Sequence, residues 1–372
     1  MSNPFPVTES LIHLNHAAVG PWPRVTADVV RSFADENLHS GSLHYPRWMH
    51  TEQDLRERFA RLINAASADE IALVKNTSEG LSFIAYGLDW KPGDNVVGIH
   101  QEFPSNRFVW QSLEPRGVEF RRLDLETATD PEQGLFDLCD QRTRLISISA
   151  VQYYNGLRMD LARIGELCRA RGILLCVDAI QQIGSLPFDV QAIGADFAVA
   201  DGHKWMLAPE GLGVMYVRAE VLDRLSVQQY GWHMTQSVGD YTQQDFELAQ
   251  SARRFECGSP NMLGIHALHA SVGLLLDEGM QTVGKAVIDN TRYLMQGLDR
   301  IDGIEILSDR DERRLSGIVT FRARSIEGDD LYRKLVGKGV LCAARGGGVR
   351  FSPHFYTPRE QIDQALSLVA EM

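Results

Sequence analysis

Short apolar runs alternate with amphipathic segments between about residues 70 and 220. The apolar runs are rich in Val, Ile and Leu without strict polar alternation, which is typical of strands buried on both faces of a parallel sheet. The segments between them carry helical periodicity, and two of these segments end at Gly117 and Gly172. This alternation predicts a three-layer α/β domain. The predicted strands lie within residues 71–76, 95–100, 118–125, 145–150, 173–179 and 196–202.

The pattern changes from about residue 260. A long helical stretch, residues 261–301, is followed by short strands that alternate with two further helices, which predicts a smaller α+β domain. The length of 372 residues also favours two domains over one packed core. We predict a large domain of residues 21–259 and a small domain that combines residues 1–20 with residues 260–372.

Composition excludes several classes of protein. The formal net charge of −12 argues against nucleic acid as a main partner, because neutralising phosphates needs a basic face. The first residues lack a basic stretch followed by an apolar one, and no apolar run approaches the length of a membrane span. The five cysteines are scattered without a C-x-x-C pair, which indicates reduced thiols. We expect a cytoplasmic protein with a small-molecule substrate, and neither a nucleic acid nor a membrane as partner.

A lysine and an aspartate follow two of the predicted strands. Lys204 comes directly after the strand at 196–202, and Asp178 ends the very apolar strand at 173–178. A carboxylate there is costly to bury without a cation or donor, and a protonated pyridine nitrogen is one such partner. The carboxylate would keep the ring cationic, so that it can accept electrons from a substrate carbanion. Taken singly, Lys204 is an ordinary surface lysine and Asp178 a helix cap, so their combination is what indicates a cofactor.

Residues 76–80, with the sequence NTSEG, follow a predicted strand and open a predicted helix. Hydroxyl and N–H groups at a helix N-terminus can bind a phosphate. The pattern is weak alone, because Ser and Thr cap helices in many proteins. It gains weight here because a phosphorylated cofactor would need its phosphate held at the same sheet edge as Lys204.

The order of these motifs resembles the class V aminotransferase family. NTSEG is followed along the chain by VDAIQ at 177–181, DGHKW at 201–205 and RRFECGSPN at 253–261. The family is a branch of the fold-type I enzymes that use pyridoxal 5′-phosphate (PLP), and it includes cysteine desulfurases, selenocysteine lyases, kynureninases and isopenicillin-N-epimerase-like proteins. The resemblance covers nearly the whole chain, from HLNHAAVG at 13–20 to the last predicted helix. It implies a fold-type I PLP-dependent transferase fold, with a large α/β/α domain and a smaller α+β domain.

The resemblance also implies a role for each residue that would hold PLP. Lys204 would form the Schiff base, and Asp178 would bind the pyridine nitrogen. Gln181 would donate a hydrogen bond to the phenolic oxygen, and Phe103 falls where many relatives stack a histidine on the ring. The phosphate would be bound by Thr77, Ser78 and His203.

Further residues would bind the substrate or the neighbouring subunit. Arg350 matches the arginine that binds the substrate carboxylate, a task that suits its planar fork. Asn15 and His16 lie in the N-terminal segment that usually lines the substrate pocket. Ser259 matches a hydroxyl that relatives lend to the phosphate of the neighbouring subunit, which implies a homodimer with shared active sites. Either Gln152 or Tyr153 takes the place of a polar group near the cofactor.

Two departures from the family pattern bear on the reaction. Relatives often have Ser where Asp201 stands, and an acid cannot bind a phosphate at neutral pH, so we expect Asp201 to orient His203 or another donor. Cysteine desulfurases carry a nucleophilic cysteine shortly before the carboxylate-binding arginine, whereas residues 343–349 contain none. Cys342 lies in a predicted strand and is interpreted as a small buried hydrophobe. We therefore expect that this enzyme is not a persulfide-forming cysteine desulfurase.

Two other patterns carry no site. Residues 279–285 match part of a phosphate-binding loop, but Ala286 replaces the Ser or Thr that binds magnesium, and no strand precedes the segment. His266 and His269 share a helix face without a third ligand, so we predict no metal site. The hypothesis is a PLP-dependent aminotransferase or C–S/β-lyase that acts on a small amino acid. The alternatives are an epimerase-like enzyme and a non-catalytic PLP-binding protein.

Overall fold

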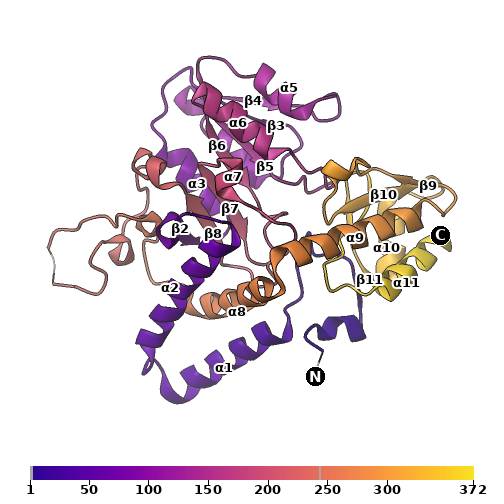
Figure 1. The fold of residues 1–372 in the computed structure, drawn as a ribbon, viewed down its shortest axis with the longest axis horizontal. Coiled ribbons are helices and arrows are strands. Elements are labelled where there is room, and N and C mark those ends of the chain that lie inside the picture. Colours follow the sequence, from indigo (N-terminus) through magenta and orange to yellow (C-terminus); the bar gives the residue numbers. More distant parts are fainter. Residues whose placement is uncertain (1–2, 243) are drawn as a thin grey trace.

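The structure is a computed structural model that describes residues 3–242 and 244–372. In this part of the chain, seven strands form a central sheet in the order β2-β8-β7-β6-β5-β3-β4 (Figure 1). Neighbouring strands are parallel except at β8, which is antiparallel to both β2 and β7. The strands are β2 (Ile71–Val74), β3 (Asn95–Ile99), β4 (Glu119–Leu123), β5 (Thr143–Ser149), β6 (Leu174–Asp178), β7 (Phe197–Asp201) and β8 (Gly213–Val217).

Both faces of the sheet are buried against helices. In β6, Leu175 and Val177 belong to an apolar cluster with residues of α2, α6 and α8, whereas Leu174 and Cys176 join a second cluster with residues of α3 and α4. The predicted three-layer α/β fold with mainly parallel strands is confirmed. The helices of the large domain and its border are α1 (Arg24–Ser40), α2 (Tyr45–Leu62), α3 (Thr77–Gly87), α4 (Ser105–Gln111), α5 (Pro131–Asp137), α6 (Leu161–Arg171), α7 (Val190–Ile193) and α8 (Met262–Glu278).

Local sequence explains where α6 begins and ends. The carboxylate of Asp160 accepts a hydrogen bond from the Arg163 amide at 3.1 Å and caps the helix N-terminus. Gly172 ends the helix with a φ of 66°, a left-handed conformation that glycine adopts without strain. The helix predicted to run to Gly117 is shorter: α4 ends at Gln111, and a 3-10 turn at 114–116 leads to Gly117.

The small domain is built on a four-stranded antiparallel sheet in the order β12-β13-β10-β9. The short strand β1 (Ile12–His13) pairs in parallel with β11 (Val340–Leu341), so the first residues of the chain join this domain. Figure 1 shows the domain beside the large one, with α9 leading into it. Its elements are α9 (Met280–Leu298), β9 (Ile304–Ile306), β10 (Val319–Ala323), α10 (Gly328–Gly337), β12 (Ala343–Arg345), β13 (Gly348–Phe351) and α11 (Arg359–Ala370).

The packing of α8 and α9 shows how the domains are joined. Met262 and Leu275 of α8 and Val283 of α9 lie in the apolar core of the large domain. Leu294 and Leu298, nearer the end of α9, lie in the core of the small domain. The domain boundary at residue 260 stays a prediction, and α9 spans both cores.

Among the described residues, no helix is long and apolar enough to cross a membrane. The five cysteines are free thiols, and three of them, Cys168, Cys176 and Cys342, are buried.

Candidate active site

A cavity of about 330 Å³ opens at the edge of the central sheet where the parallel strands end. Asp178 is the last residue of β6, and Lys204 follows the end of β7 by three residues. Strands β2 and β3 run in the same direction as β6 and β7. The segments that follow β2 and β3 therefore reach the edge of the sheet where Asp178 and Lys204 lie. The cavity brings together eight of the residues predicted from sequence: Thr77, Ser78, Phe103, Asp178, Gln181, His203, Lys204 and Arg350.

Lys204 is held in a mostly apolar position. Its side chain is largely buried, with the residue 9% exposed, and Nζ lies 5.6 Å from the centre of the Phe103 ring. Burial lowers the pKa of Lys204 to about 8, against the opposing effect of Asp178. A substantial fraction of the amine is therefore neutral near pH 8 and able to accept a proton.

Asp178 is a buried carboxylate with few partners. One oxygen accepts a hydrogen bond from the Ile180 amide at 3.2 Å. Burial raises the pKa of Asp178 to about 6. Within the described residues, it makes no ion pair within 4.0 Å, and the attraction of Lys204 offsets only part of the effect of burial. A cationic group bound in the cavity would neutralise its charge.

The N-terminus of α3 lies at another wall of the cavity. The side chain of Asn76 caps the helix by accepting a hydrogen bond from the Glu79 amide at 2.9 Å. Ser78 donates its hydroxyl to Ser105 at 2.7 Å, and the buried hydroxyl of Thr77 has no partner among the described residues. Together with the positive end of the helix dipole, these groups suit an anion.

His203 and Asp201 lie next to each other at the cavity. Asp201 Oδ1 is 3.1 Å from His203 Nδ1, a contact that favours electrostatic attraction although neither atom completes a hydrogen bond with good geometry. The role of Asp201 in orienting His203 stays a prediction, and this contact supports it.

Gln181 connects the lysine loop to the N-terminal segment. Its Nε2 donates to the Ala17 carbonyl at 3.0 Å, and its Oε1 accepts a hydrogen bond from the Trp205 indole at 2.8 Å. Gly20 donates its amide to the His203 carbonyl at 2.8 Å, and a Cβ on Gly20 would lie only 2.2 Å from the Lys204 carbonyl oxygen. Glycine at position 20 therefore allows the segment to close against the lysine loop. One hydrogen of Nε2 remains for the predicted contact with the cofactor.

Arg350 is a buried cation that forms no ion pair with an acid among the described residues. The residue is 2% exposed, Nη1 donates to the Tyr153 carbonyl at 2.6 Å, and Nε has no partner among the described residues. Burial lowers the pKa of Arg350 to about 10. An anionic ligand in the cavity would compensate this charge, as the predicted substrate carboxylate does.

Three predicted site residues do not line this cavity. His16 is fully buried, with Nδ1 2.9 Å from the Ser352 carbonyl and Nε2 2.7 Å from the Tyr356 hydroxyl. Asn15 forms a bridge with Ser352, and Ser259 lines a separate hollow after β2. Their roles toward substrate and neighbouring subunit stay predictions.

The groups present fit PLP. A buried carboxylate that is only partly compensated suits a pyridinium nitrogen, a largely buried lysine suits the aldehyde carbon, and an orphan hydroxyl at a helix N-terminus suits a phosphate. Phe103 presents an aromatic ring beside Lys204. In each case, the cofactor would supply the charge, the covalent partner or the hydrogen-bond partner that the side chain lacks.

Sequence reasoning missed Glu102, which lies directly before Phe103. Glu102 is 1% exposed and accepts hydrogen bonds from the Ser149 amide at 2.7 Å, the Ser149 hydroxyl and Gln152 Nε2 at 3.2 Å. Burial raises the pKa of Glu102 to about 7. Gln152 is thus used inside the protein, whereas Tyr153 faces the cavity. The only feature of the sequence that pointed to Glu102 is its place between the end of a predicted strand and Phe103.

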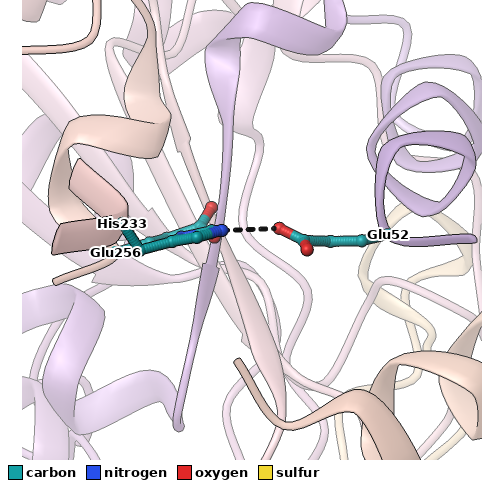
Figure 2. A group of neighbouring side chains, drawn as sticks. All are labelled: Glu52, His233 and Glu256. Atoms are coloured by element: carbon teal, nitrogen blue, oxygen red, sulfur yellow. Dashed lines mark ion pairs between the residues drawn. The ribbon is translucent and has the colours of Figure 1, made fainter. Parts of the chain in front are cut away.

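A buried ionic cluster lies elsewhere, and sequence reasoning missed it too. Figure 2 shows Glu52 of α2 facing His233, with Glu256 beside the imidazole. His233 Nε2 lies 3.5 Å from Glu52, and its Nδ1 lies 3.7 Å from Glu256. Arg56 Nη2 is 2.6 Å from both carboxylates, so a protein cation already lies between them. The cluster therefore reads as an internal charge network that joins α2 to the segment around His233.

Comparison with known proteins gives one family across the chain. The family model for aminotransferase class-V matches residues 12–365. A probable cysteine desulfurase of Methanothermobacter thermautotrophicus is 32% identical over 380 residues, covering 96% of this chain and 93% of the relative. A cysteine desulfurase of Haloferax volcanii is 29% identical over 386 residues, covering 97% and 89%.

Solved structures share the fold. A complex of the cystine C–S lyase C-DES with its product cysteine persulfide superposes with a TM-score of 0.92 at 23% identity, covering 99% of each chain. Apo cysteine desulfurase from Thermococcus onnurineus NA1 gives a TM-score of 0.88 at 23% identity, covering 100% of this chain and 98% of that one. At this identity the likeness shows the fold alone.

These relatives correct one expectation. The prediction that the chain is not a persulfide-forming cysteine desulfurase is wrong, because relatives that match almost its whole length are named cysteine desulfurases. The prediction depended on one short loop without a cysteine. Cys342 is buried as expected, with its pKa raised to about 12 by burial, but that observation does not separate the chain from these relatives.

Proposed function

The chain belongs to the aminotransferase class-V family and uses PLP, and we propose that it cleaves the carbon–sulfur bond of a cysteine-type amino acid. The observation that carries the proposal is the cavity in which Lys204, Asp178 and Arg350 meet, each buried without a full set of partners. The names of the relatives support a sulfur amino acid over other small amino acids. Cleavage with formation of a persulfide is part of the proposal.

Each residue of the cavity has a task that follows from its position. Lys204 would hold the cofactor covalently, Asp178 would pair with the ring nitrogen, and Thr77 with Ser78 would donate to the phosphate at the N-terminus of α3. Phe103 would pack on the ring, which keeps stacking without adding a titratable group there. When bound, PLP supplies an electron sink for the charge that develops at the substrate α-carbon.

The substrate would be oriented by Arg350 and deprotonated by Lys204. The guanidinium of Arg350 would bind the α-carboxylate, which fixes the α-carbon in the cavity. The Lys204 amine, whose pKa of about 8 leaves a neutral fraction at physiological pH, would take the α-proton. The same ammonium group could then protonate the sulfur that leaves.

We also propose a cytoplasmic homodimer with shared active sites. Ser259 lies outside the cavity of its own chain and is exposed, on a loop that follows Cys257 and Gly258. A hydroxyl in that position is available to a second copy. Sedimentation of the purified protein tests the dimer, and loss of PLP affinity in Ser259→Ala tests the shared site.

The experiment that tests the function uses purified holoenzyme and a panel of amino acids. We expect turnover of cysteine or cystine with release of sulfide or persulfide, and no turnover in Lys204→Ala. Conversion of alanine to pyruvate in the presence of a keto acid would instead indicate an aminotransferase. Loss of optical activity without net conversion would indicate an epimerase. No spectral change with any amino acid would leave a non-catalytic PLP-binding protein, and the proposal would be abandoned.

A further inference from the structure

Glu102 is a buried acid that lies behind one wall of the cofactor cavity. It follows β3 and accepts three hydrogen bonds, from the amide of Ser149, from the hydroxyl of Ser149 and from Gln152 Nε2. Among the described residues it forms no ion pair, so hydrogen bonds alone support its carboxyl group. No step of the proposed reaction uses this acid.

Ser149 connects Glu102 to the cavity. It is the last residue of β5, it lines the cavity, and it pairs in register with Asp178 of β6. Because paired residues of neighbouring strands project their side chains from the same face of a sheet, the Ser149 hydroxyl and the Asp178 carboxyl group are neighbours. Ser149 therefore contacts the buried acid and also forms part of the wall beside Asp178.

The surroundings of Glu102 favour a carboxyl group that keeps its proton up to neutral pH. Burial raises the pKa of Glu102 to about 7, and the charge of Asp178 acts in the same direction, against the hydrogen bonds that Glu102 accepts. Cys176 of β6 and Tyr154 after β5 also interact with it electrostatically. Burial raises the pKa of Cys176 and raises that of Tyr154 to about 12, so both are neutral at pH values where Glu102 and Asp178 titrate.

The two protonation states of Glu102 give the Ser149 hydroxyl opposite roles. When Glu102 is ionised, this hydroxyl donates to the carboxylate and offers only its lone pairs to the cavity. When Glu102 is protonated, its proton lies on Oε2, because Oε1 already accepts hydrogen bonds from the Ser149 amide and from Gln152. The acid then donates to the Ser149 hydroxyl, and the hydrogen of that hydroxyl is free to point into the cavity.

We propose that Glu102 is a positioning residue whose protonation decides whether Ser149 donates or accepts a hydrogen bond in the cofactor cavity. With Glu102 protonated, the wall beside Asp178 gains one donor, and with Glu102 ionised it loses that donor. A donor at this place stabilises negative charge on the groups that surround the bound PLP, so the absorption of the cofactor should follow the proton on Glu102. The inference concerns the cofactor site and does not depend on which amino acid is cleaved.

The first measurement determines the protonation of Glu102 in the apoenzyme. Infrared spectra from about pH 5 to about pH 9 record the C=O stretch of protonated carboxyl groups. We expect a band that disappears as the pH rises through about 7 and that Glu102→Gln lacks. Ser149→Ala removes a donor to the ionised carboxylate and should move this midpoint upward by about one to two pH units. The matched control Ser147→Ala should leave it in place, because that hydroxyl, two residues earlier on β5, donates to Asn106 at 2.7 Å.

The second measurement determines whether Ser149 passes the change on to the cofactor. The ultraviolet–visible absorption of PLP bound to Lys204→Ala is followed over the same pH range, in a background where the lysine cannot titrate. We expect a transition with the midpoint of Glu102, which adding Ser147→Ala preserves. Adding Glu102→Gln or Ser149→Ala should abolish it. Gln fixes the neutral state, because its Nε2 donates to the Ser149 hydroxyl at every pH while its Oε1 still accepts from the Ser149 amide.

Three outcomes overturn the proposal. A transition that persists in Ser149→Ala at a higher pH would show that Glu102 acts on the cofactor through its charge alone. A Glu102 band that is absent, or unchanged up to about pH 9, would show that the acid keeps one protonation state. A cofactor spectrum without any transition at the midpoint of Glu102 would show that the two are not coupled. If Glu102→Gln does not fold, the comparison of Ser149→Ala with Ser147→Ala still decides between these results.

Discussion

Replacing Asp178 with Asn tests the electrostatics of the cavity before any reaction takes place. Asp178 is 2% exposed, and burial raises its pKa from 3.8 to about 6. The difference between these values corresponds to about 3 kcal/mol, at about 1.36 kcal/mol per unit. Because the raised pKa favours the protonated carboxyl in the folded state, stability from this group is fully present below pH 3.8. It is lost as the pH rises through about 6.

The apoenzyme with Asp178→Asn does not have the free-energy cost of burying a charged carboxylate. It should be more stable to urea than the wild-type apoenzyme above about pH 6, by at most about 3 kcal/mol, and the difference should shrink toward about pH 4. Part of the gain is offset, because Asp178 also stabilises the charged form of Lys204. Asn keeps an oxygen for the Ile180 amide, so the local turn is retained.

Urea unfolding of both apoenzymes, followed by tryptophan fluorescence at about pH 5 and about pH 8, measures the difference. Adding PLP should reverse the order, because a pyridinium gives the wild-type carboxylate its missing partner. A variant apoenzyme that is less stable than wild type at about pH 8 would refute the burial argument. Equal stabilisation of the two proteins by PLP would refute the contact between Asp178 and the ring.

Three further substitutions test other parts of the structure. Lys204→Ala should fold but form no covalent PLP adduct after borohydride reduction, and an adduct on another lysine, found by mass spectrometry, would contradict its role. Arg350→Lys should raise KM by about ten- to a hundredfold with a smaller change in kcat, because the bidentate fork is lost; steady-state kinetics that change only kcat would argue against carboxylate binding. Glu256→Gln should lower the free energy of unfolding by about 3 kcal/mol, because Arg56 loses half of its buried charge compensation. Urea unfolding checks this value, and hydrogen exchange around His233 should accelerate.

The central sheet could be predicted because its strands are apolar on both faces. Each predicted strand from 71–76 to 196–202 overlaps a strand of the structure, although β5 begins at Thr143, two residues before the predicted range 145–150, and the alternate residues of β6 enter different apolar clusters. Strand β8 was missed, since Gly213–Val217 follows a loop and is antiparallel to its neighbours. Hydrophobic periodicity does not show which strands pair. A strand that does not follow the alternation of strand and helix is therefore not identified by that alternation.

That the candidate cofactor residues share one cavity could be predicted, because parallel strands that run in the same direction end at one edge of a sheet. Asp178 and Lys204 follow adjacent strands, so their order along the chain already places them together. Glu102 and the cluster of Glu52, Arg56, His233 and Glu256 could not be found in this way. Their partners come from segments far apart in sequence, and only the spacing of Glu52 and Arg56 on one helix face hints at a contact.

The sequence motif at residues 13–20 predicted that the N-terminal segment lines the cavity, but not which of its side chains do so. Pairing of β1 with β11 and the bridge from Asn15 to Ser352 hold residues up to 16 in the small domain, which turns His16 toward Tyr356. The chain then approaches the lysine loop so closely that Gly20 has no room for a side chain. From this segment, the residues that line the cavity are consequently Ala17, Ala18 and Val19, which lie between these two anchors. Their small or aliphatic side chains shape the cavity without offering a polar group, so no chemical pattern in the sequence could have singled them out.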